Sequence, residues 1–133
     1  MKKIIILGAT GFIGKNITLH FSKEKNYEVH AVCFKRKPYK TSENVKWHKA
    51  DLREPKLVDK LIKGKDIVIQ AAATTSGSKD IVSSPHIHVT DNAVINSYIF
   101  RAAHEHKVKH LIFTSCTVMY PSSNKPTKEN SFN

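Results

Sequence analysis

The sequence predicts an α/β fold in which helices cover both faces of a parallel sheet, and three observations lead to this prediction. Short β-branched runs alternate along the chain with longer stretches of helical periodicity. The first run, Lys3–Leu7, is continuously apolar, which is typical of a strand buried on both faces. Three of the five glycines then lie within residues 8–14, between this run and the first helical stretch. A strand, a glycine-rich turn and a helix in this order begin a β-α-β unit.

The other elements are read in order along the chain. Apolar residues at helical spacing predict a helix after the glycines, and Pro55 suits the first turn of a second, short helix. We expect strands at Lys3–Leu7, Glu28–Phe34, Val45–His48, Asp66–Gln70 and Val108–Thr114, and helices at Phe12 to about Lys23, Pro55–Ile62 and His88 to about His106. The polar residues from Pro121 onward lack periodicity. We therefore expect one folded domain at residues 1–120 and a loop or disordered tail at 121–133.

The composition is that of one soluble domain. The 133 residues fall within the usual ~100–150 of a single domain, and 40% of them are hydrophobic. No apolar run approaches the ~20 residues that span a bilayer, and the run after Lys2 and Lys3 breaks at Gly8, too early for a secretory signal. Two cysteines, Cys33 and Cys116, make no disulfide framework. We expect a cytoplasmic protein without membrane contact.

The charge and the histidines point to no further partner. Of the 22 basic residues behind the net charge of +11, most are lysines spread along the chain, as on a solvated surface. No nucleic-acid-binding motif accompanies them, so we expect no nucleic-acid partner. The closest histidine pairs, His86/His88 and His104/His106, have members two residues apart, which point to different sides of a helix. We expect no metal site.

The glycine-rich turn has the spacing of a phosphate-binding loop. Gly8 permits a tight turn out of the strand, Gly11 lets a pyrophosphate approach the backbone, and Gly14 lets the helix lie close to the sheet. The first N–H groups of the helix then face the phosphates, and the helix dipole favours their negative charge. The alternative is an ordinary glycine-rich turn between a strand and a helix.

The sequence GATGFIG at residues 8–14, after the strand sequence KIIIL, resembles the extended short-chain dehydrogenase/reductase family. This family contains NAD(P)-dependent epimerases, dehydratases and reductases that act on nucleotide sugars. The resemblance continues in order to about Pro121, and residues 71–77 (AAATTSG) are similar to the GDP-L-fucose synthase branch. It implies a Rossmann-type sheet of about five strands in the order 3-2-1-4-5, incomplete at its C-terminal end.

The same resemblance implies which residues contact the cofactor. NAD-preferring members carry an acid after the second strand, whereas this chain has Lys35 and Arg36, which suit the 2′-phosphate of NADP. The alternative is a basic loop in a lysine-rich chain, with NAD as the cofactor. Asp51 and Leu52 correspond to a pair that contacts adenine, with the alternative that Asp51 caps the helix near Pro55.

Two more stretches complete the expected cofactor site. Small residues at 71–73 let the cofactor pass over the strand ends, or they are simply well packed. Asn92 corresponds to a buried asparagine that braces the active-site strand, the alternative being a solvent-facing residue. The predicted cofactor-binding residues are Gly8, Thr10, Gly11, Phe12, Ile13, Gly14, Lys35, Arg36, Asp51, Leu52, Ala71, Ala72, Ala73 and Asn92.

The resemblance places a catalytic hydroxyl residue four positions before Tyr120, where this chain has Cys116. A thiol is a weak hydrogen-bond donor, so either Ser115 or Thr117 takes this role in a shifted register, or the site is impaired. Cys116 is alternatively a small core residue. The family's catalytic Tyr-x-x-x-Lys motif is missing from residues 1–133.

The resemblance therefore implies the NAD(P)-binding portion of a nucleotide-sugar epimerase, dehydratase or reductase. We expect this chain alone to be inactive, because the tyrosine and lysine that transfer the proton are absent. The alternatives are a non-catalytic NADP-binding sensor or interaction module, and a basic interaction protein that keeps the fold as a scaffold. Relatives pair through helices, which makes the 88–106 helix the expected contact of a homodimer.

Overall fold

The computed structural model describes residues 1–75, 82–115 and 120–131. Five strands form one parallel sheet in the order β3-β2-β1-β4-β5, which confirms the predicted fold. The strands are β1 (Lys2–Leu7), β2 (Tyr27–Cys33), β3 (Val45–Lys49), β4 (Ile67–Gln70) and β5 (His110–Phe113). Because the strand order reverses between β1 and β4, their carboxyl ends flank a crevice in which α/β proteins bind ligands.

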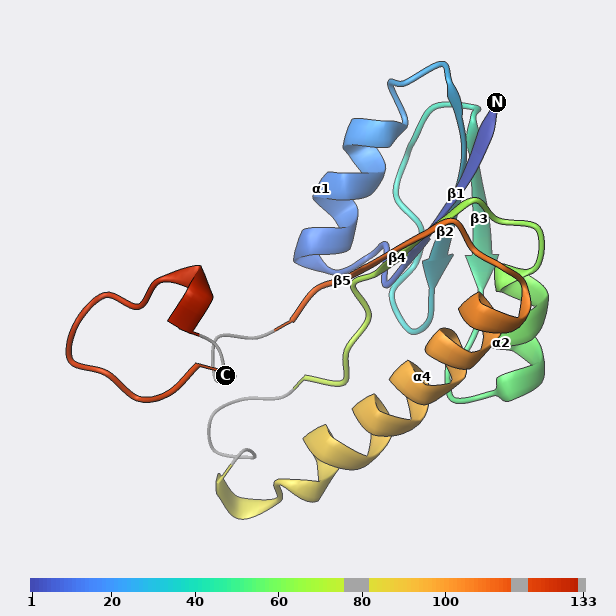
Figure 1. Ribbon diagram of the computed structural model, residues 1–133. Helices are drawn as coiled ribbons and strands as arrows, with labels where there is room; N and C mark the ends of the chain where they lie inside the picture. Colours follow the sequence, from blue (N-terminus) through green and yellow to red (C-terminus); the bar gives the residue numbers. More distant parts are fainter. Residues whose placement is uncertain (76–81, 116–119, 132–133) are drawn as a thin grey trace.

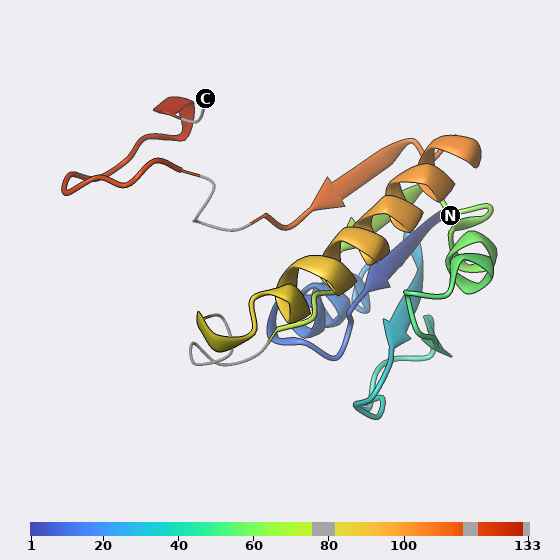
Figure 2. The same ribbon diagram turned by 90° about the horizontal axis from the view of Figure 1, so that it is seen from below.

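Helices cover both faces of the sheet (Figure 1). The helix α1 (Phe12–Phe21) lies on one face, and α2 (Pro55–Ile62) and α4 (His86–Glu105) lie on the other. Figure 2 shows α4 lying lengthwise along the strands. Residues 120–131 lie away from the sheet in both views and contain a 3₁₀ helix, η2 (Glu129–Ser131). No helix in the described part of the chain is long and apolar enough to cross a membrane.

The strand β1 contributes to two hydrophobic clusters, one on each face. Ile5 and Leu7 pack in the cluster that includes Ile62 of α2 and Ile99 of α4. Ile4 and Ile6 point to the opposite face, where partly buried residues of α1 pack against the cluster. These four strand residues are completely buried, and such burial contributes roughly 2 kcal/mol for each side chain. The continuous apolar run of the sequence is therefore explained by helices on both sides of β1.

Two elements, α4 and β5, begin two residues away from their predicted starts. The helix α4 begins at His86, two residues before the predicted start, because Pro85 occupies its N-cap position. The strand β5 begins at His110 instead of Val108. The chain first closes the end of α4, with the N–H of Val108 donating to the carbonyl of Ala103 (2.9 Å) and Lys107 at a φ of 53°.

Candidate functional site

The turn from β1 into α1 is built so tightly that two of its glycines cannot carry a side chain. Gly8 has a φ of 79°, and a Cβ atom there would lie 2.7 Å from the backbone of Ala72 at the end of β4. A Cβ atom on Gly14 would overlap the carbonyl oxygen of Gly8. These two glycines therefore serve the close packing of the turn against β4 and of α1 against the turn.

Gly11 occupies a different environment. A Cβ atom there would lie 3.3 Å from the carbonyl oxygen of Gly8, and its φ of −76° is accessible to any residue. Gly11 is the N-cap of α1, so no side chain caps this helix end. The N–H groups of the first helical turn cannot bond within the helix, and the helix dipole makes this end attractive to an anion.

The carboxyl ends of the strands and the glycine turn enclose a cleft of about 570 Å³. The cleft brings together most of the predicted cofactor-binding residues, and these are Gly8, Thr10, Gly11, Phe12, Lys35, Arg36, Asp51, Leu52, Ala71, Ala72 and Ala73. Ile13 and Gly14 lie in α1 outside the lining, and Asn92 acts on the lining indirectly. The sequence prediction missed several lining residues, and those with side chains suited to ligand contacts are Phe34, Arg53, Thr74, Thr75, Asp91 and Ile95.

The basic loop after β2, residues 35–40, contacts the glycine turn. The Tyr39 hydroxyl lies 3.2 Å from the carbonyl oxygen of Ala9 and 3.3 Å from that of Lys15, so its single proton is shared between them. Burial raises the pKa of Tyr39, which keeps the hydroxyl a donor. One Arg36 nitrogen lies 3.4 Å from the carbonyl oxygen of Thr10. These contacts hold the basic loop beside the glycine turn.

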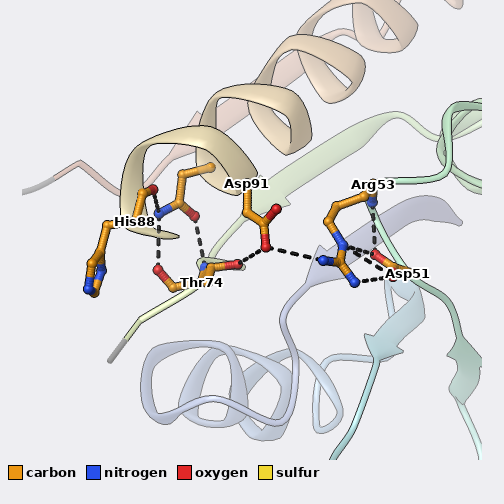
Figure 3. Close-up of polar contacts among 6 residues, drawn as sticks. Asp51, Arg53, Thr74, His88 and Asp91 are labelled. Atoms are coloured by element: carbon orange, nitrogen blue, oxygen red, sulfur yellow. Dashed lines mark hydrogen bonds and ion pairs between the residues drawn. The ribbon is translucent and has the colours of Figure 1, made fainter. Parts of the chain in front are cut away.

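A polar network crosses the cleft from the turn after β3 to α4 (Figure 3). Arg53 donates to both carboxylate oxygens of Asp51, with the shortest contact at 2.7 Å, and another of its nitrogens donates to Asp91 at 3.2 Å. The Thr74 hydroxyl reaches the same Asp91 oxygen at 3.4 Å. Hydrogen bonds from Arg53 lower the pKa of Asp51. Asp51 does not cap α2, whose N-cap is Glu54.

Side-chain amides of α4 hold the chain where it leaves β4. Asn92 accepts a hydrogen bond from the N–H of Thr74 (2.8 Å) and donates to the Thr74 carbonyl (3.0 Å). The buried side chain of Gln70 exchanges hydrogen bonds with the backbone of Ala72 and donates to Asn96 at 2.8 Å. Asn92 therefore faces the β4 exit instead of solvent, and the small residues 71–73 are fixed from the α4 side.

The predicted catalytic residues are only partly covered by the structure. Ser115 is exposed just beyond β5. Cys116 and Thr117 lie outside the described residues, as does Gly77 at the end of the stretch similar to the GDP-L-fucose synthase branch. The role of Ser115 stays a prediction. In residues 1–75, 82–115 and 120–131, no group of three or more histidine, cysteine or acidic side chains is placed to hold a metal ion.

The chain is similar to known proteins in sequence and in fold. Residues 4–133 match the family model described as "NAD dependent epimerase/dehydratase family". No curated protein matches the chain significantly.

Several solved structures share the fold. An epimerase from Methanothermobacter thermautotrophicus matches 99% of this chain with a TM-score of 0.86 and 19% identity. The UDP-N-acetylglucosamine 4-epimerase of Methanobrevibacter ruminantium M1, in complex with UDP-N-acetylmuramic acid, matches 96% with a TM-score of 0.80 and 24% identity. The UDP-glucose 4-epimerase of Bifidobacterium longum, in complex with NAD+ and UDP, matches 96% with a TM-score of 0.76 and 21% identity. The match spans 41%, 42% and 42% of these three chains, respectively.

Proposed function

Because the chain belongs to the NAD-dependent epimerase/dehydratase family, we propose that it is the NAD(P)-binding portion of an enzyme that acts on nucleotide sugars. One observation carries this proposal: the glycine turn, the basic loop and the ends of β3 and β4 line one cleft where the strand order reverses. The structures solved with NAD+ and UDP, and with a UDP-sugar, support the choice of ligands.

The residues of the cleft fit a dinucleotide. Gly11 leaves the N-terminus of α1 open to a pyrophosphate, since neither a capping group nor a side chain occupies it. The small side chains of Ala71–Ala73 leave room in the cleft for the ribose. The ionised carboxylate of Asp51 can accept a hydrogen bond from the amino group of adenine. When bound, NAD(P) supplies the carbon that accepts or returns a hydride.

Binding is tested by titrating the chain with NADPH and with NADH and following the fluorescence of the reduced nicotinamide. We expect saturable binding of both, because the pyrophosphate and adenine contacts are common to them. If neither nucleotide binds, the proposed function fails.

We propose that NADP is preferred, with Arg36 as the residue that distinguishes it. A guanidinium beside the glycine turn can bind the 2′-phosphate through two charge-assisted hydrogen bonds. Arg36→Ala is expected to weaken NADPH binding by about tenfold while changing NADH binding by less than about twofold. Lys40→Ala is the matched control, since Lys40 is on the same loop but does not line the cleft. Tighter binding of NADH than NADPH by the parent chain would contradict the preference.

We also propose that this chain binds the nucleotide without turning over a sugar. None of its four tyrosines has a lysine four residues later, because Ala31, Glu43, Ala102 and Asn124 occupy those positions. We expect neither a change in absorbance at the reduced-nicotinamide band nor conversion of UDP-glucose to its 4-epimer when the chain is mixed with NAD+ or NADP+ and UDP-glucose. Measurable reduction or epimerisation, above that of a Gly11→Val variant as the blank, would contradict this expectation.

A further inference from the structure

We propose that Arg53, held in place by Asp91, is a positioning residue that fixes the Asp51 carboxylate, so that the cleft selects a base with an exocyclic amino group over one with an oxo group. This inference rests on the proposed function, since it concerns the base of the bound dinucleotide. It assigns roles to two residues, Arg53 and Asp91, that lie far apart in the sequence and meet across the cleft.

Arg53 binds the Asp51 carboxylate through two side-chain nitrogens, each closest to a different oxygen. Its Nε lies 3.0 Å from Oδ1, and its Nη2 lies 2.7 Å from Oδ2. The backbone N–H of Arg53 also donates to Oδ1 at 3.0 Å. Nε also lies 3.2 Å from Oδ2, so three side-chain contacts and one backbone contact leave the carboxylate little freedom to rotate. The Nε–H is a single proton shared between the two oxygens, so the carboxylate takes three of the about four protons that it can accept and retains capacity for one donor from a ligand.

Asp91 holds the guanidinium from the other side. The remaining nitrogen, Nη1, donates to Asp91 Oδ2 at 3.2 Å, and the Thr74 hydroxyl lies 3.4 Å from that same oxygen. In Figure 3 the guanidinium lies between the two carboxylates. Arg53 is therefore fixed between the turn after β3 and the helix α4, and it transmits this fixed position to Asp51.

The surroundings of this network suit a flat ring with one polar edge. The guanidinium carbon lies 5.8 Å from the centre of the Phe34 ring. Leu52 and Ile95, each 7% exposed, line the same cleft. With apolar residues beside it, the fixed carboxylate of Asp51 is placed to hydrogen-bond to the polar edge of a planar heterocycle.

The chemistry of Asp51 determines which edge is accepted. Hydrogen bonds from Arg53 lower the pKa of Asp51, so its carboxylate is ionised near neutral pH and only accepts hydrogen bonds. Adenine presents a donor in its amino group. Hypoxanthine presents a carbonyl oxygen at the same position, which would place two acceptors against each other with no proton between them.

The test compares NAD+ with nicotinamide hypoxanthine dinucleotide by isothermal titration calorimetry on the full chain. The parent is expected to bind NAD+ at least about tenfold more tightly, because a site built for a donor rejects an acceptor. Arg53→Gln should reduce this ratio to less than about threefold, mainly by weakening NAD+ binding, and Arg53→Lys should give an intermediate ratio since it keeps the charge but loses the two-nitrogen contact. Arg101→Gln is the control, because Arg101 pairs with Glu105 on the surface of α4 and does not line the cleft.

A second measurement needs no ligand. Carbon-13 NMR titration of the Asp51 carboxyl should show its pKa rising in Arg53→Gln, and rising by less in Asp91→Asn, where only the outer contact is lost. Circular dichroism confirms that each variant is folded. An equal loss of affinity for both dinucleotides in Arg53→Gln, or an unchanged Asp51 pKa, would overturn the inference. Equal binding of the two dinucleotides by the parent overturns this inference alone, whereas binding of neither overturns the proposed function with it.

Discussion

Gly14→Ala is expected to destabilise the native fold by about 3 kcal/mol or more, enough to unfold much of a domain with ordinary stability. A methyl group at this position would overlap the carbonyl oxygen of Gly8. That oxygen belongs to the backbone of the turn, so α1 must move away from the sheet to relieve the overlap. Alanine favours a helix over glycine by only about 1 kcal/mol, which does not offset the loss of packing. Urea denaturation followed by circular dichroism measures the effect.

Gly11→Ala is the matched control, because it adds the same methyl group three residues earlier. Its Cβ atom would lie 3.3 Å from the same Gly8 oxygen, and its backbone conformation is ordinary. We expect its free energy of unfolding to change by less than about 1 kcal/mol. Similar destabilisation by the two substitutions would show that Gly14 is not required for packing α1 against the turn.

Acid is expected to destabilise the chain by about 2–3 kcal/mol between pH 6.5 and 4, through a histidine pair on β2 and β3. His30 is 8% exposed, and burial, together with the charge of Lys65, lowers its pKa from 6.5 to about 4. The unfolded chain therefore binds a proton in this range that the native chain does not, and stability falls as the pH falls. Hydrogen bonds from Lys46 lower the pKa of Glu28 from 4.5 to about 2, so stability falls further below pH 4.5.

The hydrogen bonds of His30 fix the position of its ring proton. Its Nε2 lies 2.9 Å from a Glu28 oxygen, which only accepts, so the ring proton of His30 is on Nε2. Its Nδ1 then accepts from Nε2 of His48, also at 2.9 Å. A second proton on His30 would lie on Nδ1, so the contact with His48 would persist only if His48 moved its own proton from Nε2 to Nδ1. Thermal unfolding across this pH range tests the effect: His30→Gln should flatten the dependence above pH 4.5, whereas His104→Gln, at an exposed position on α4, should keep it. A parent chain with equal stability at pH 4.5 and 6.5 would refute the argument.

The order of the strands and helices could be predicted because it depends on local patterns. The run Lys3–Leu7 needs burial on both faces, and Pro55 marks the start of α2, whose bounds agree with the prediction. The ends of β5 could not be predicted, because they depend on contacts distant in sequence. The N–H groups of Lys109 and His110 both donate to the carbonyl of Asp66, and this places the chain in the sheet only from His110 onward.

The candidate site also contains a part that the sequence predicts and a part that it does not. The glycine turn and the basic loop follow directly from residues that are neighbours in sequence. Arg53 and Asp91 are 38 residues apart, and although each adjoins a predicted site residue, nothing in the sequence pairs them with each other. Their pairing depends on how α4 crosses the turn after β3. One contact between α4 and the exit of β4 could have been expected from the sequence. Gln70 ends an apolar strand, and a glutamine buried there needs hydrogen-bond partners for its amide.

The amide contacts between α4 and the exit of β4 also limit how this helix can move. Asn92 and Asn96 lie one helical turn apart, and each binds a different residue of the β4 exit. A slide of α4 by one turn, about 5.4 Å, would carry both asparagines past their partners. Gln70 would then lose its bond to Asn96 and keep one unpaired N–H in its buried position, at a cost of about 1–3 kcal/mol. Helices that shear over a sheet are one means by which domains close around ligands. The amides of Asn92 and Asn96 therefore oppose such a slide. The helix α4, which forms one wall of the cleft, keeps a single register against the sheet.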